Sequence, residues 1–270
     1  MTANLLVVCT ANIARSPLAA ALLQVHVRAR GLEDQVRIAS AGTRAREGYA
    51  AAQPSVAIAA GWGVDLRRHR SQPVTDELLA SSDLIVTMTE VHRDALGGRG
   101  AGVSERCFTL YELRRLLHGV DVAAASSQAS SPASPQSASQ ASSPASQQAA
   151  SRGSSPASPQ SASQGSSQAS SPASPDGHPG SSPLAISERV AVAVRQAHQR
   201  RPVSARSGRE DIPDPYGRDE EVYQAVATEL VEAVGAIATP LFGPVPAAAH
   251  ANLPRPPRAS RPRRLRRRRG

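Results

Sequence analysis

Residues 4–31 read NLLVVCTANIARSPLAAALLQVHVRARG, and this stretch decides the fold. Residues 4–8 form a short apolar run that ends at a polar loop, which is typical of a buried parallel strand. Ser16 and Pro17 then open a segment in which leucine and valine recur at helical spacing, and Pro17 suits the first helical position. Gly31 can end this helix. The order strand, tight loop and helix predicts the first unit of a parallel sheet.

The alternation of strands and helices continues through the chain. Further strands are expected at residues 36–40, 84–88 and 107–109. Further helices are expected at residues 54–61, 75–80, 90–96, 111–117, 184–199 and 219–237. We therefore predict the α/β class, a three-layer α/β/α fold around a short parallel sheet of about four strands.

The composition changes sharply after residue 122. Residues 123–183 are rich in Ser, Ala, Gln and Pro, and SSPASPQSASQ occurs at 130–140 and again at 154–164. These units have too few apolar residues to bury a face, so we predict a disordered insert. Loop closure costs only about 0.6 kcal/mol more for each doubling of length, so the flanking parts can form one domain. The predicted organisation is a first domain part (1–122), the insert (123–183), a second domain part (184–240) and a disordered Pro/Arg-rich tail (241–270).

Charge and cysteine content limit the cellular setting. The chain has a formal net charge of +9, and residues 255–269 hold nine arginines with no acid after Glu232, so residues 1–254 are formally neutral. Cys9 and Cys107 are the only cysteines and give no disulfide framework, which favours a reducing cytoplasmic compartment. There is no recognisable signal peptide and no apolar stretch of about 18 residues, so we expect no transmembrane segment.

The loop between the first strand and the first helix reads CTANIARS at residues 9–16, a C-x5-R-S pattern. Such a loop gathers backbone N–H groups at a helix N-terminus, where the helix dipole also favours an anion, and it can bind a phosphate group. The same field favours a thiolate over a thiol at Cys9. Arg15 can offer a two-pronged donor to two phosphoryl oxygens. The alternative is that Cys9 is an inert buried residue at a strand end. The expected phosphate-binding residues are Thr10, Ala11, Asn12, Ile13, Ala14, Arg15 and Ser16.

Five segments together resemble the low-molecular-weight protein tyrosine phosphatases of bacterial type. These are VVCTANIARSPLAAALL (7–23), SAGT (40–43), GVDLRRHRS (63–71), SDLIVTMTEVHRDAL (82–96) and DIPDPYGR (211–218). The resemblance implies a phosphomonoester hydrolase, a protein-tyrosine-phosphatase that works without a cofactor or metal through a cysteinyl-phosphate intermediate. Its substrate would be a phosphotyrosine protein or an aryl phosphate.

The resemblance also implies the roles of individual residues. Cys9 would be the nucleophile, Arg15 the phosphate clamp and Asp214 the general acid that protonates the leaving oxygen. Asp214 could instead be a turn residue or helix cap, and Asp211 is the rival acid. Ser16 would hydrogen-bond the Cys9 sulfur.

Further residues are expected behind and beside the loop. Ser40 and His69 would support Asn12 from behind, although His69 could equally be an exposed residue of an Arg-rich stretch. Tyr216 and Tyr49 would line the substrate cleft, and the alternative for Tyr216 is an aromatic plug between loop and sheet.

The chain departs from the family pattern at several positions. Ala14 stands where many relatives carry a second cysteine. Arg44 and Arg46 follow SAGT, where relatives carry a tryptophan, and Gly217 replaces the second of a tyrosine pair. Arginines at the rim of a cleft would favour acidic phosphopeptides, and the alternative is a solvated basic loop.

Two other functions remain open at this stage. An arsenate reductase of related fold would use the same loop but needs two further thiols, and only Cys107 is available. A catalytically weak binding module could use the arginines of residues 255–269 to hold nucleic acid or an anionic membrane surface.

Overall fold

The computed structural model describes residues 1–122, 124, 184–202 and 210–254. The described residues belong to one compact unit. The predicted disordered insert, from residue 125 onward, and residues 255–270 of the predicted tail lie outside the described residues.

Four parallel strands form the sheet, in the order β2-β1-β3-β4. They are β1 (Ala3–Cys9), β2 (Val36–Gly42), β3 (Leu84–Thr87) and β4 (Cys107–Thr109). In the register, Cys9 lies opposite Gly42, and Val8 lies opposite Thr87. The carboxyl ends of the three neighbouring strands therefore meet at one edge, beside the phosphate loop. The predicted α/β fold with a four-stranded parallel sheet is confirmed.

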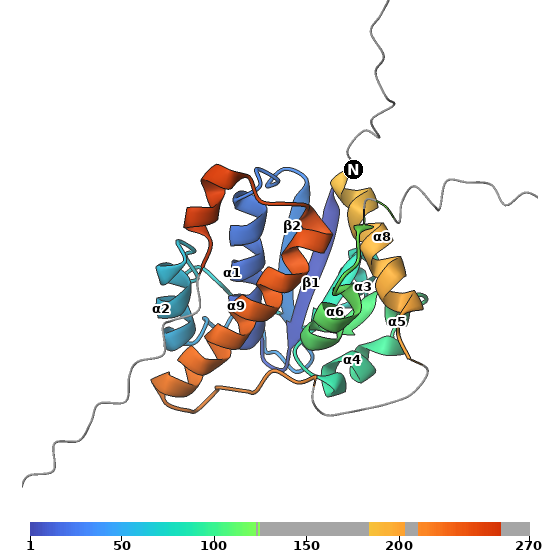
Figure 1. Cartoon of the computed structure of the whole chain (residues 1–270). Helices are drawn as coiled ribbons and strands as arrows, with labels where there is room; N and C mark the ends of the chain where they lie inside the picture. Colours follow the sequence, from blue (N-terminus) through green and yellow to red (C-terminus); the bar gives the residue numbers. More distant parts are fainter. Residues whose placement is uncertain (123, 125–183, 203–209, 255–270) are drawn as a thin grey trace, which may run out of the picture. The chain divides into compact units, whose positions relative to one another are not determined.

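Helices cover both faces of the sheet (Figure 1). One apolar core holds Leu5 and Val7 of β1 together with buried side chains of α1, α2, α6, α8 and α9. A smaller core on the other face holds Leu6 and Val8 with residues of α3, α4 and α5. The alternation of β1 side chains between the two cores follows from the pleat of a strand. The helices are α1 (Arg15–Arg28), α2 (Gln53–Gly61), α3 (Asp76–Ser81), α4 (Glu90–Gly97), α5 (Val103–Arg106), α6 (Leu110–Leu117), α8 (Ile186–Gln199) and α9 (Glu220–Phe242).

The C-terminal part of the described chain extends further than the sequence predicts. Helix α9 continues through Pro240 to Phe242, and a 3-10 helix η1 (Ala247–Asn252) follows. Guanidinium groups from α8 and from the turn after α1 explain this extension. Arg189 donates to the Pro240 carbonyl at 3.0 Å, and Arg30 donates to the Gly243 carbonyl at 2.8 Å. These cations satisfy carbonyls at the helix end and face the negative end of its dipole.

Helix α9 is long and apolar enough, by length and composition alone, to cross a membrane. This is weak evidence for a membrane span, because a buried core helix meets the same criteria, so it does not contradict the expectation of no transmembrane segment. In the fold the helix lies in the core, where Leu230, Val234 and Ile237 are fully buried.

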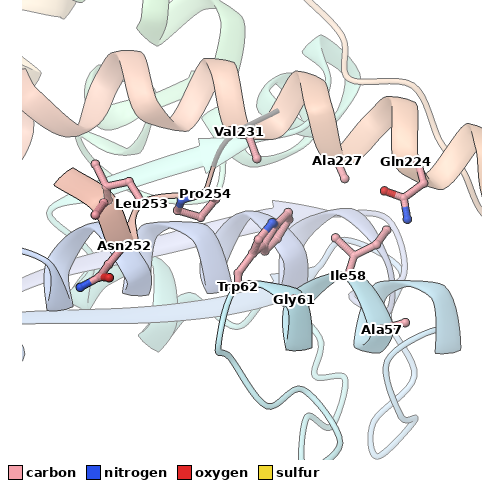
Figure 2. A pocket seen from close by; sticks show the side chains of 11 residues that line it. Ala57, Ile58, Gly61, Trp62, Gln224, Ala227, Val231, Asn252, Leu253 and Pro254 are labelled. Atoms are coloured by element: carbon pink, nitrogen blue, oxygen red, sulfur yellow. The ribbon is translucent and has the colours of Figure 1, made fainter. Parts of the chain in front are cut away.

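A cavity of about 490 Å³ lies between α2, α9 and the chain at the end of η1. Figure 2 shows Trp62 and Ile58 on one side and Val231, Leu253 and Pro254 on the other. None of the cavity's lining residues belongs to the phosphate loop. The C-terminal segment thus lines an open cavity that has no share in the site described next.

Candidate active site

The phosphate loop leaves the sheet at the carboxyl end of β1 and enters α1 at Arg15, two residues before the predicted start at Pro17. Cys9 is the last residue of β1 and is only 3% exposed. Its Sγ lies 3.0 Å from the Ser16 Oγ. The sulfur therefore sits at the helix N-terminus, where backbone N–H groups and the dipole favour negative charge.

Asn12 holds the loop in shape from inside. It is fully buried, and its φ of 56° lies in the left-handed region, which asparagine tolerates better than most residues. Its Nδ2 donates to Ser16 Oγ at 3.0 Å and to Ser40 Oγ at 2.9 Å. Its Oδ1 accepts from the Gln72 backbone N–H at 3.1 Å, and its carbonyl accepts from His69 Nε2 at 2.7 Å. Ser40 and His69 thus lie where the sequence expected them, and Gln72 is an addition.

The hydrogen-bond network fixes the proton positions of Ser16 and His69. Because Ser16 Oγ accepts from Asn12, its own proton is free for Cys9 Sγ at 3.0 Å, with the Ala41 carbonyl a more distant acceptor at 3.4 Å. His69 must carry its proton on Nε2 to donate to the Asn12 carbonyl. Burial lowers the pKa of His69, and Arg70 adds to this shift while the hydrogen bond to Asn12 opposes it. His69 therefore acts as a neutral donor that braces the loop.

Arg15 joins the phosphate loop to a distant segment. Its guanidinium is almost fully buried and donates from Nη1 to the Ile212 carbonyl at 3.1 Å. Its Nη2 donates to Thr10 Oγ1 at 3.3 Å and forms an ion pair with Asp214 Oδ2 at 2.5 Å. Arg15 and Asp214 are 199 positions apart in the sequence. The fold therefore assembles the three expected catalytic residues at one place.

The segment that carries Asp214 is fixed by backbone contacts. The Ile212 N–H donates to the Met88 carbonyl at 2.8 Å, and Asp211 Oδ1 accepts from the Glu90 N–H at 2.7 Å. The carboxylate of Asp211, the rival acid, thus accepts a hydrogen bond from the first residue of α4. Asp219 caps α9 by accepting from the Val222 N–H at 3.1 Å. Among the acids of this described segment, Asp214 is the one paired with Arg15.

The sequence interpretation missed His92 of α4, whose ring contacts Thr10 of the phosphate loop. Thr89 Oγ1 accepts from the His92 backbone N–H at 3.2 Å, so its proton points to His92 Nδ1 at 2.8 Å. His92 Nε2 then carries the ring proton and donates to Thr10 Oγ1 at 2.9 Å. Burial lowers the pKa of His92 to about 4, aided by Arg15 and opposed by Asp214. Thr89 has a residue type typical of a helix cap, but no local pattern signals the ring contact with Thr10.

A cleft opens beside the loop, with a volume of about 240 Å³. Tyr49 and Tyr216 both line it and are 55% and 64% exposed. This exposure argues against Tyr216 as a buried plug. The lining residues are Ala11, Ile13, Arg44, Arg46, Tyr49, Ser71 and Tyr216.

The second cysteine takes no part in this constellation. Cys107 is fully buried in β4, and burial raises its pKa to about 12. Ala14 is also buried and gives the loop no second thiol. Both cysteines are free.

Comparisons with known proteins find similar sequences. The family described as low molecular weight phosphotyrosine protein phosphatase matches residues 4–133. The chain is 34% identical over 115 residues to the probable low molecular weight protein-tyrosine-phosphatase EpsP of Ralstonia nicotianae, covering 43% of this chain and 75% of that one. It is also 34% identical over 116 residues to the protein-arginine-phosphatase of Bacillus subtilis, again covering 43% and 75%.

Among solved structures, a YwlE mutant from Bacillus subtilis is 19% identical, with 88% of this chain and 97% of that chain covered and a TM-score of 0.49. The family match of residues 4–133 includes the phosphate loop, SAGT and the α4 segment, but Asp214 lies beyond it. On the sequence similarity to these relatives, the chain belongs to the low molecular weight phosphotyrosine protein phosphatases.

Proposed function

We propose that this chain is a protein-tyrosine-phosphatase that works through a cysteinyl-phosphate intermediate on Cys9. The observation that carries the proposal is the meeting of Cys9, Arg15 and Asp214 at the carboxyl edge of the sheet. The first and second domain parts supply these groups jointly, so we propose one phosphatase domain built from both.

In the first step the phosphate dianion sits among the backbone N–H groups of residues 10–16. Arg15 exchanges its contacts with Ile212 and Asp214 for two phosphoryl oxygens. Cys9 Sγ attacks phosphorus, and the bond from phosphorus to the phenolic oxygen breaks. Asp214 gives its proton to that oxygen, because a phenolate is a poor leaving group.

In the second step water attacks the cysteinyl phosphate. Asp214, now a carboxylate, takes a proton from this water, and the bond between phosphorus and sulfur breaks. The Ser16 hydroxyl donates to the departing Cys9 sulfur, which eases its return to the thiolate. Inorganic phosphate leaves, and the chain is ready for another cycle.

The substrate class has a specific rival, because one relative is named a protein-arginine-phosphatase. Tyr49, Tyr216 and Ile13 offer apolar and aromatic surface to a phenyl ring. Arg44 and Arg46 line the same cleft and would repel a guanidinium next to phosphorus. These features support phosphotyrosine over phosphoarginine.

Arsenate reduction is less well supported. A thiol relay would need Cys107, yet this thiol is buried in β4 and its pKa is raised to about 12. A thiol that stays protonated and covered is a poor nucleophile.

Two further proposals concern the chain outside the site. The nine arginines of residues 255–269 suit a weak anionic partner, and deletion of residues 254–270 should then reduce retention on heparin. A cytoplasmic location is supported by two free cysteines and no disulfide framework.

The test compares wild type and Cys9→Ser on an aryl phosphate, a phosphotyrosine peptide and a phosphoarginine peptide. We expect wild type to prefer the phosphotyrosine peptide over the phosphoarginine peptide. We expect the variant to lose turnover by on the order of 10⁴-fold or more while it still binds phosphate, because the loop amides and Arg15 remain. Turnover that survives Cys9→Ser would refute the cysteinyl-phosphate mechanism.

A further inference from the structure

We propose that Arg44 and Arg46 form a subsite for carboxylate side chains beside the phosphate loop, so that acidic phosphotyrosine peptides are the preferred substrates. This inference rests on the proposed function. Both residues line the cleft beside the phosphate loop and give it a positive charge.

The two arginines are the charged residues among those that line the cleft. Both are exposed, and within the described part of the chain neither guanidinium has a hydrogen bond or ion pair. By contrast, Arg93, Arg99 and Arg115 are each paired with a carboxylate. Arg44 and Arg46 thus keep their donors available to a ligand.

The loop that carries them is fixed against the phosphate loop. Ser71 is buried and holds it through four hydrogen bonds. The Ser71 hydroxyl donates to the Arg46 carbonyl at 2.5 Å and accepts from the Tyr49 N–H at 3.0 Å. The Ser71 backbone accepts from the Gly48 N–H and donates to the Tyr49 carbonyl, both at 2.8 Å. The Arg44 N–H donates to the Thr10 carbonyl at 2.9 Å, which ties the loop directly to the catalytic segment.

This arrangement distinguishes the subsite from a solvated basic loop. The guanidinium groups start from a backbone that is already ordered, so binding need order only the side chains. The phosphorylated ring would lie between Tyr216 and Tyr49, above Ala11 and Ile13. Side chains next to it in a peptide would then reach Arg44 and Arg46, where acidic residues are attracted and basic residues repelled.

The effect should be modest, because exposed ion pairs in water are weak. For two pairs we expect a preference of about threefold to tenfold in kcat/KM for an acidic peptide over a neutral one. The preference should shrink in about 1 M salt, where the Debye length falls to roughly 3 Å.

The experiment uses three phosphotyrosine peptides of equal length whose flanking residues are acidic, neutral or basic. Kinetics are measured for wild type, the double variant Arg44→Ser with Arg46→Ser, and the charge reversal Arg44→Glu with Arg46→Glu. The matched control is Arg37→Ser, an exposed arginine near the start of β2, at the opposite end of this strand from SAGT. We expect the acidic preference in wild type and in Arg37→Ser, its loss in the double serine variant, and a preference for the basic peptide after charge reversal.

Three results would overturn the subsite. They are a wild type without an acidic preference, a double variant that loses rate equally on all three peptides, and an Arg37→Ser variant that loses the preference as well. If wild type fails to hydrolyse any of the peptides and also an aryl phosphate, the proposed function itself is refuted. Hydrolysis of all three peptides at equal rates refutes the subsite alone.

Discussion

The phosphate loop and the segment that carries Asp214 contribute to one site in different ways. The loop is contiguous, and its strand, turn and helix place Cys9 and Arg15 within seven residues of each other. The acid segment comes 199 positions after Arg15 and depends on two backbone contacts, at Met88 and Glu90. The loop is therefore a local property of the sequence, whereas the acid is placed by the fold.

After the loss expected of Cys9→Ser, the largest effect should come from Asp214→Asn. The variant keeps an acceptor for the Tyr216 N–H but has no proton to give, so phenyl phosphates with poor leaving groups should slow by about 10²- to 10³-fold. Aryl phosphates with acidic leaving groups should slow far less. A plot of kcat against the leaving-group pKa would measure this difference.

The matched control for Asp214→Asn is Asp211→Asn. Asparagine at 211 can still accept from the Glu90 N–H, so the segment should stay in place and the dependence on leaving group should match wild type. A steeper dependence in Asp211→Asn than in Asp214→Asn would move the general acid to Asp211 and contradict the ion-pair geometry.

The next effect concerns the phosphate loop, which Gly42 at the end of β2 approaches closely. A Cβ at this position would lie 2.5 Å from the Thr10 carbonyl oxygen and 3.0 Å from the Asn12 nitrogen. Both are backbone atoms that cannot move away cheaply, so Gly42→Ala should lower the free energy of unfolding by about 1–3 kcal/mol. Urea denaturation measures the change.

Gly235→Ala in α9 is the comparison for Gly42→Ala. No atom lies within 4 Å of a Cβ added there, and alanine suits a helix interior. We expect stability to rise by about 0.5–1 kcal/mol or stay the same. Equal losses of stability in both variants would show that the close approach of Gly42 to the Thr10 carbonyl does not cause the loss.

The sequence predicts the phosphate loop and its flanking strand and helix well, and it predicts the placement of Asp214 only in part. The pattern from residue 4 to residue 31 is sufficient for β1, the loop and α1, because these elements follow neighbour to neighbour along the chain. The DIPDPYGR motif indicates Asp214, but its contact with Arg15 needs the whole fold. His92 and Ser71 were missed, since their partners Thr10, Arg46 and Tyr49 lie 22 to 82 positions away. The end of α9 was predicted too early, because Arg30 and Arg189, which bind carbonyls at this end, lie far away in the sequence.

His92 connects the two regions and gives the smallest predicted effect. It donates to Thr10 of the loop, and the charges of Arg15 and Asp214 both act on its pKa, which burial lowers to about 4. The pKa in the unfolded chain is about 6.5, so as the pH falls from 6.5 to 4 the unfolded chain takes up the proton first. The folded state should therefore lose stability through this window, by an amount on the order of 1 kcal/mol from His92.

Replacement of His92 by glutamine tests this coupling. Above pH 6.5 the ring is neutral in both states, so pH should have no effect through this residue, and below pH 4 the loss should level off. His26, whose pKa is also lowered to about 4, remains in the variant and keeps its own share of the slope. We therefore expect the free energy of unfolding of His92→Gln to fall less steeply between pH 6.5 and 4 than that of wild type. Parallel curves would mean that burial beside Thr10 does not hold His92 neutral. Arg15 would then be the residue that couples the phosphate loop to the segment of Asp214.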